Sequence, residues 1–175
     1  MKEPTLEVVS VSLGSVKRDT DQVVEVLGRK VHIRRIGTGG DIKKAEALIG
    51  EFDGHVDAIG LGGIDLYFAV RERRYYVRDA LRLARASKST PVVCGAGLKN
   101  TLERLSVKAL APSVGWQGRK VLMVSAVDRF GMAEELARQG ADVFYGDVVF
   151  ALGLPVPVRS LGGLVRLATV LAPIV

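Results

Sequence analysis

Short apolar runs, glycine-rich turns and amphipathic segments follow one another along most of the chain. Buried strands are predicted at LEVVSVSL (6–13), VDAIGL (56–61), PVVCG (91–95), KVLMV (120–124) and ADVFY (141–145). Strands that alternate with helical segments are typical of parallel sheets covered by helices. The pattern therefore predicts an α/β fold with a mostly parallel, Rossmann-like sheet and helices on its faces.

Two pairs of strand-like segments are separated by connections too short for a crossover helix. QVVEV (22–26) and KVHIRRI (30–36) are joined by Leu-Gly-Arg, and YFAV (67–70) and YYV (75–77) flank the charged segment RERR. Only antiparallel strands can be joined so closely, so both pairs are predicted to be β-hairpin excursions from the sheet. The arginines of RERR are interpreted as an exposed hairpin tip, with stacking of Tyr75 and Tyr76 on a nucleic acid as the alternative.

Apolar residues recur at helical spacing in four segments. These are DIKKAEALIGEF (41–52), RDALRLARAS (78–87), LKNTLERLSVKAL (98–110) and residues 130–139. Asp41 is predicted to cap the first of them, because an aspartate at this position accepts a hydrogen bond from a free N–H group of the helix.

The segment APSVGWQGR carries a proline, two glycines and no helical period. It predicts a linker at 112–119 between an N-terminal α/β domain at 1–111 and a Rossmann-like βαβ unit at 120–175, which is expected to be incomplete. Arginines and prolines interrupt the apolar segment at 148–175, so it does not predict a membrane span. We interpret it as a core or interface segment, through which copies of the chain form a homo-oligomer.

The composition narrows the setting in which the protein works. The 175-residue chain has a formal net charge of +6, which favours anionic partners, and a single cysteine, Cys94. One cysteine cannot form an internal disulfide, and the start of the chain lacks a signal-peptide pattern, so a cytoplasmic location is expected. His32 and His55 have no partners at metal-ligand spacing, and no metal site is predicted. The scarcity of asparagine beside abundant arginine and glutamate is typical of thermophilic proteins.

Glycines mark most of the predicted strand ends, where ligands bind in open parallel sheets. The strongest candidate is CGAGLKN, in which Gly95 and Gly97 lead into a helix start that carries Lys99, Asn100 and Thr101. Free N–H groups at a helix start, a lysine and two polar side chains suit an anionic metabolite. A tight turn whose glycines serve packing alone is the alternative.

Two further strand ends carry candidate chemistry. Asp65 follows one strand and is expected near Lys99 if the two strands are neighbours, so the two residues are a candidate proton-transfer pair or an ordinary ion pair. Ser12 and Ser15 are suited to a carboxylate or polyol, or form a polar turn. In GTGGD (37–41), capping by Asp41 is favoured over a phosphate cradle.

The turn of the βαβ unit, VSAVDRFG, lacks the glycines of a dinucleotide-binding loop. Glycine would be expected near Val124, Ala126 and Arg129, and only Gly131 is present nearby. Asp147 follows the second strand, where an acidic residue would hold a ribose or would simply belong to a loop. The residues alone therefore favour a ligand other than a dinucleotide at this turn, or no ligand.

The longest motifs resemble a bacterial group commonly labelled quinate 5-dehydrogenase, or quinate/shikimate dehydrogenase-like. The resemblance is carried by VVSVSLGSVKRD, RIGTGGDIKKAEALI, DAIGLGGIDLYF, RRYYVRDALRLA, PVVCGAGLKNTLER, VDRFGMAEELARQGADVFYGDVVFALGLP and PVRSL. Members of the group appear longer than this chain. The N-V-T-x-P-x-K and N-T-D segments of true shikimate and quinate dehydrogenases are absent.

The resemblance implies an oxidoreductase that uses NAD or NADP on a cyclic polyol carboxylate. Lys99 and Asp65 would then transfer the alcohol proton, and Ser12, Ser15 and Asn100 would hold the substrate. The cofactor would be faced by residues of the βαβ unit, namely Ser125, Asp128, Arg129, Gly131 and Asp147. A non-catalytic module that binds a small anionic metabolite is the second hypothesis. Nucleic-acid binding through the basic clusters at 16–19, 29–35 and 71–74 is the least favoured.

Overall fold

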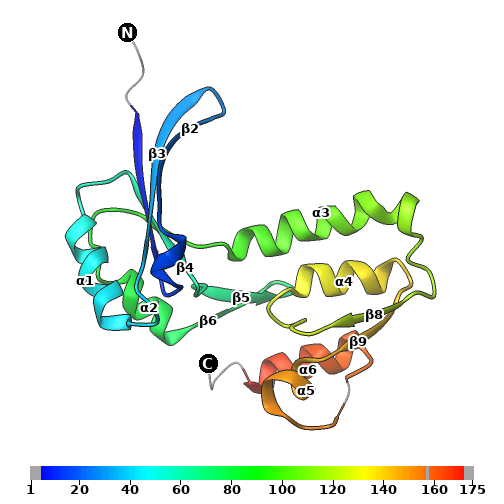
Figure 1. The fold of residues 1–175 in the computed structure, drawn as a ribbon. Helices are drawn as coiled ribbons and strands as arrows, with labels where there is room; N and C mark the ends of the chain where they lie inside the picture. Colours follow the sequence, from blue (N-terminus) through cyan, green and yellow to red (C-terminus); the bar gives the residue numbers. More distant parts are fainter. Residues whose placement is uncertain (1–4, 157, 172–175) are drawn as a thin grey trace. The chain divides into compact units, whose positions relative to one another are not determined.

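Figure 1 shows the computed structural model of the protein, which describes residues 5–156 and 158–171. The chain divides into two compact units, each with its own hydrophobic core. Unit 1 consists of residues 1–66 and 77–95, and unit 2 of residues 67–76 and 96–175. Pro157 and the last four residues of the apolar C-terminal segment lie outside the described residues.

Unit 1 is built on a five-stranded sheet in the order β2-β3-β1-β4-β7. Its strands are β1 (Leu6–Ser12), β2 (Thr20–Val26), β3 (Arg29–Gly37), β4 (Ala58–Gly62) and β7 (Val92–Val93). β3, β1, β4 and β7 are parallel, and β2 pairs antiparallel with β3. The predicted α/β class, the mostly parallel sheet and the first hairpin are therefore confirmed.

One face of this sheet carries the core of unit 1. α1 (Ile42–Phe52) and α2 (Arg78–Ala84) lie side by side against it (Figure 1). Val9 of β1 pairs with Ile59 of β4, so both side chains point to the same face, where they are fully buried. Burial of this face against the two helices accounts for the apolar residues at every second position of the strands, such as Val9 and Val11 of β1.

Asp53 follows α1 and binds the connection that leads into β7. Its carboxylate accepts hydrogen bonds from the backbone N–H groups of Thr90, Ser89 and Lys88, each at 2.8 Å, and from the Ser87 hydroxyl at 2.8 Å. These bonds favour the charged form and hold the pKa of the Asp53 carboxyl far below its usual range. Asp53 thus joins the end of α1 to the start of β7.

Asparagine in place of Asp53 is expected to lower the midpoint of thermal unfolding by several degrees at neutral pH. A lowered pKa stabilises the folded protein above the ordinary carboxyl pKa of about 4, and this stabilisation is lost as the pH falls towards the folded value. The difference between wild type and variant should therefore narrow as the pH is lowered from about 7 to about 3. Circular dichroism melts measure it, with Glu51→Gln at an exposed position of α1 as the control. A difference that stays constant with pH would contradict this role.

Unit 2 combines the second hairpin with a strand–helix–strand unit. The hairpin consists of β5 (Tyr67–Val70) and β6 (Arg73–Tyr76), as predicted around RERR. The remaining elements are α3 (Ala96–Val114), β8 (Lys120–Met123), α4 (Phe130–Arg138), β9 (Asp142–Tyr145), α5 (Asp147–Leu152) and α6 (Leu161–Leu171). β8 and β9 are parallel and connected through α4, which confirms the βαβ pattern.

The core of unit 2 includes side chains from β9, α4 and α6. Phe130, Tyr145 and Leu164 are almost completely buried there. Since Leu164 belongs to α6, part of the apolar C-terminal segment is core, as one of its two interpretations predicts. Trp116, the only tryptophan of the chain, packs against this core, and its indole N–H donates to the Val107 carbonyl at 2.9 Å. Tryptophan fluorescence therefore reports on unit 2.

α3 is longer than the helix predicted at 98–110. It extends to Val114 and contains Pro112 in its last turn. A proline within a helix removes the hydrogen bond of its own nitrogen and crowds the carbonyl four residues earlier, and α3 ends two residues after Pro112. The first residues of the predicted linker are thus helical, and the non-helical connection to β8 begins at Gly115.

Candidate functional site

The hairpin β5–β6 and one face of α3 form a cleft within unit 2. Ala69 pairs with Arg74 across the hairpin, so their side chains share the face that Tyr67 also occupies. The α3 residues of the cleft are spaced three, four and seven positions from the first, which puts them on one face of the helix. This hairpin cleft, of about 340 Å³, is lined by Tyr67, Ala69, Arg71, Glu72, Arg74, Gly97, Asn100, Thr101 and Arg104.

The lining of the hairpin cleft is predominantly positive. The Arg74 guanidinium lies over the Tyr67 ring, 4.7 Å from its centroid. Arg104 is already paired, because its Nη2 atom lies 2.7 Å from Oε2 of Glu134 on α4. Arg71 and Arg74 form no ion pair within the described part of the chain. Two guanidinium groups at the cleft therefore lack a compensating partner among the described residues.

Arg71 stands at the tip of the hairpin in a left-handed backbone conformation, with φ of 56°. Glycine is favoured at such a position, because any side chain there is strained by roughly 1 kcal/mol. Non-glycine residues held in this region often belong to functional sites. The backbone of the tip is thus strained at the residue that brings a guanidinium to the cleft.

The polar side chains that α3 contributes have different hydrogen-bonding capacities. The Thr101 hydroxyl donates to the Gly97 carbonyl at 2.9 Å, so its oxygen remains an acceptor for a ligand. The Asn100 amide has no hydrogen-bond partner among the described residues and offers both a donor and an acceptor. The cleft therefore combines cationic donors with neutral acceptors.

Three residues of the predicted anion-binding segment, Gly97, Asn100 and Thr101, lie in the hairpin cleft. Gly95 belongs to unit 1 instead, where a Cβ on it would lie 3.7 Å from Oδ1 of Asp65. The strands before Asp65 and Gly95, β4 and β7, are neighbours in the sheet, as the proposed proximity requires. Asp65 belongs to unit 1 and Lys99 to unit 2, so their proton-transfer pairing stays a prediction.

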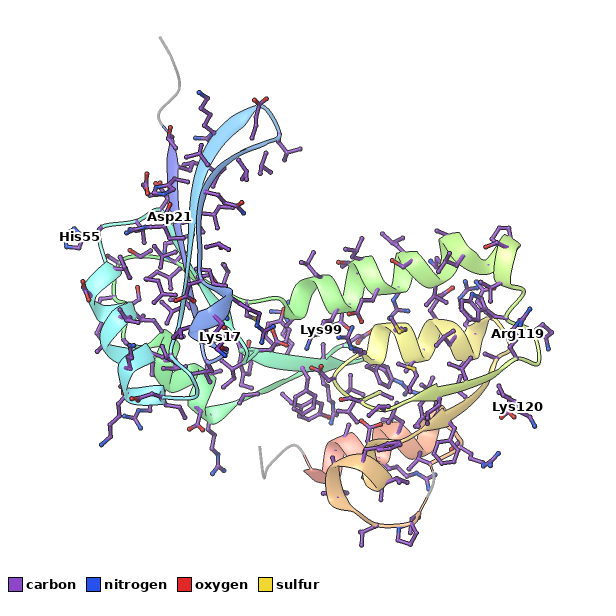
Figure 2. The ribbon with its side chains drawn as sticks, viewed as in Figure 1. Lys17, Asp21, His55, Lys99, Arg119 and Lys120 are labelled. Carbon is purple, nitrogen blue, oxygen red and sulfur yellow. The ribbon has the colours of Figure 1, made fainter. Side chains whose placement is uncertain are left out.

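Lys99, in the first turn of α3 (Figure 2), forms an ion pair with Asp128 of the turn between β8 and α4. Its Nζ atom lies 2.6 and 2.8 Å from the two carboxylate oxygens. The next residue of the turn, Arg129, pairs with Glu103 of α3. Two residues that the sequence assigns to a cofactor thus join the turn to α3 in this structure, and their cofactor role stays a prediction.

Gly131 allows α3 and α4 to approach closely. A Cβ at this position would lie 3.0 Å from both the Cα atom and the carbonyl oxygen of Asn100. Contacts this short require the neighbour to move, and backbone atoms inside a helix move at a high cost. The close packing of two helices is sufficient to explain the glycine.

Asp147 lies beneath the turn of the βαβ unit and is 9% exposed. Its two carboxylate oxygens accept hydrogen bonds from the N–H groups of Ala126 and Val127, at 3.0 and 2.9 Å. These are amides that a dinucleotide-binding turn would present to a pyrophosphate. Both amides are bonded to Asp147 in this structure, and the predicted cofactor role of the turn and of Asp147 stays a prediction. Ser125, in the same turn, is exposed.

At the carboxyl edge of unit 1, the loops bind one another. The Ser12 hydroxyl oxygen accepts from Gly14 N–H at 3.1 Å and from Arg35 Nη2 at 2.8 Å. Ser15 caps the short helix η1 (Val16–Arg18) by accepting from Lys17 N–H. The predicted ligand roles of Ser12 and Ser15 therefore stay predictions, and both oxygens already have structural partners.

The segment GTGGD shows the favoured capping role. The Asp41 side chain accepts from Lys44 N–H at 2.9 Å, which confirms it as the N-cap of α1. The amides of Gly39 and Gly40 donate to the carbonyls of Gly14 and Leu13. These two amides are consequently committed to loop–loop contacts rather than to a phosphate.

The sequence did not reveal the arginines of the hairpin cleft as site residues. Arg71, Arg74 and Arg104 read as a charged hairpin tip and a helix surface, because the packing of the hairpin against α3 is a long-range contact. The available signal was the spacing of Asn100 and Arg104, which places both on one helical face. A hairpin partner for that face could not be identified from spacing alone.

The described residues contain no cluster of three or more His, Cys, Asp or Glu side chains arranged to hold a metal ion. No helix in the part of the chain that the structure covers is long and apolar enough to cross a membrane. A search of curated protein sequences found no match. Residues 7–94 match the domain of unknown function DUF8753, and residues 97–175 match the domain of unknown function DUF8754. Since the first match covers half of the sequence, the chain belongs to the DUF8753 family, with a DUF8754 domain following in the same chain.

Proposed function

We propose that the protein binds a small anionic metabolite in the hairpin cleft. The observation that carries this proposal is the pair of guanidinium groups of Arg71 and Arg74, which face a hollow of about 340 Å³ without a carboxylate partner among the described residues. Guanidinium groups bind carboxylates and phosphates through paired hydrogen bonds. The volume falls at the lower end of the range for small-molecule sites.

The resemblance to the group labelled quinate 5-dehydrogenase agrees with this class of ligand, because quinate and shikimate are carboxylates. It also implies an NAD- or NADP-dependent oxidoreductase, in which Lys99 and Asp65 would transfer a proton. The cleft supports the binding of an anion. Including NADH and NADPH among the test ligands shows whether the protein also binds the cofactor that an oxidoreductase needs. A homo-oligomer formed through the apolar C-terminal segment remains part of the proposal.

Glycine in place of Arg71 is expected to weaken anion binding by about 10- to 100-fold without lowering stability. The variant loses one charge-assisted interaction, worth about 1.5–3 kcal/mol. Glycine also removes the strain of the left-handed backbone at this position, so the free energy of unfolding should stay within about 0.5 kcal/mol of wild type or rise. Isothermal titration calorimetry with quinate, shikimate, inorganic phosphate, NADH and NADPH measures the affinities.

The matched control is Arg73→Ala, which removes the same charge from the same hairpin. Arg73 pairs with Val70, so its side chain points to the opposite face and does not line the hairpin cleft. Its affinity for anions should stay close to that of wild type. Equal losses in both variants would show that only the general charge of the hairpin matters, and no binding of any anion would overturn the proposed function.

A further inference from the structure

We infer that the ligand of the hairpin cleft is a phosphomonoester that carries hydroxyl groups, as a sugar phosphate does. This inference rests on the proposed function and adds the chemical class of the ligand. It follows from the guanidinium groups without an ion-pair partner and from the hydrogen-bond acceptors that line the same cleft.

The two guanidinium groups without an ion-pair partner favour a ligand with more than two acceptor oxygens. Arg104 has its own carboxylate partner in Glu134, whereas Arg71 and Arg74 have no ion-pair partner among the described residues. A phosphate with two negative charges and three terminal oxygens can satisfy both groups, each through paired hydrogen bonds. A single carboxylate has only two oxygens and forms paired hydrogen bonds with one guanidinium at a time, so the number of acceptor oxygens distinguishes the two ligands in a lining that also contains Glu72.

The acceptors of the cleft require donors on the ligand. The Thr101 hydroxyl uses its proton on the Gly97 carbonyl, so only its oxygen lone pairs face a ligand. Glu72 adds a carboxylate to the same lining. Neither group can bind a phosphate oxygen, which is itself an acceptor. Hydroxyl groups next to the phosphate supply the donors that Thr101 and Glu72 need.

Isothermal titration calorimetry on the full chain tests the phosphate and the hydroxyl groups of the ligand separately. The ligands compared are ribose 5-phosphate, ribose, inorganic phosphate and ribonate, which is the sugar acid of ribose. Ribose 5-phosphate is expected to bind at least about tenfold more tightly than ribonate, inorganic phosphate or ribose, because each of these lacks one part of the recognised group. Thr101→Val, which keeps the shape of the side chain, should weaken ribose 5-phosphate several-fold and leave inorganic phosphate unchanged.

The pH dependence identifies the charge state that binds. The second ionisation of a phosphomonoester lies near pH 6, so the affinity for ribose 5-phosphate should rise about tenfold between about pH 5 and about pH 7. The affinity for ribonate, which is fully ionised throughout, should not change in parallel. Ribonate thereby controls for titration of Glu72 and Glu134, the acidic groups at and next to the cleft, since no histidine lines it among the described residues.

The outcomes separate this inference from the proposed function. If ribonate binds as tightly as ribose 5-phosphate and both depend on Arg71, the cleft binds anions but the phosphate assignment is overturned. If inorganic phosphate binds as tightly as ribose 5-phosphate, the hydroxyl assignment is overturned. If no anion binds to the folded wild-type chain, both the inference and the proposed function are wrong.

Discussion

Alanine in place of Asp147 is expected to lower the free energy of unfolding of unit 2 by about 3 kcal/mol. The change leaves the N–H groups of Ala126 and Val127 without their acceptor beneath the turn. Each hydrogen bond to a charged group contributes about 1.5–3 kcal/mol, and removing the buried carboxylate returns part of that through its lower desolvation cost. Urea unfolding followed by Trp116 fluorescence measures the loss in unit 2.

The control for Asp147 is Asp142→Ala on β9. Asp142 is exposed, and its side chain has no hydrogen bond among the described residues. Its replacement should change the free energy of unfolding by no more than about 0.5 kcal/mol. A similar small effect at Asp147 would mean that water satisfies the two amides equally well, and the turn would then be accessible to an external anion.

Alanine in place of Gly131 is expected to destabilise the protein by about 1–3 kcal/mol, because the added Cβ presses on the backbone of Asn100. Gly162→Ala is the matched control. It lies in the first turn of α6 as Gly131 lies in the first turn of α4, and a Cβ there meets nothing within 4 Å. In an open helical position alanine should stabilise by about 0.5–1 kcal/mol. Urea unfolding of both variants gives opposite signs if helix packing is the reason for Gly131.

The class of fold follows from local patterns that the sequence displays directly. Apolar runs such as the one at 6–13 predict buried strands, and the four-residue segment RERR predicts a hairpin because no crossover fits between its flanking strands. Asp41 caps α1 as expected, since capping depends only on residues within one helical turn. The C-terminal end of α3 was predicted less well. A helix tolerates a proline such as Pro112 only near its end, and the sequence does not show where that end lies.

The candidate site was only partly predictable, because long-range packing decides it. Gly97, Asn100 and Thr101 were identified from the helix start alone, and all three lie in the hairpin cleft. Arg71 and Arg74 were not, since nothing in RERR indicates which helix the hairpin packs against. The partner of Asp147 lies about 20 residues earlier in the chain, at a turn whose missing glycines gave no sign of a carboxylate in place of a phosphate.

The boundary between the two family matches divides the hairpin cleft, although both of its walls belong to unit 2. The hairpin falls within the residues that match DUF8753, whereas the α3 residues of the cleft fall within those that match DUF8754. Each sequence family therefore encodes one wall of the hairpin cleft. A gene fragment cut between residues 95 and 96 would separate Arg71 and Arg74 from Asn100 and Thr101.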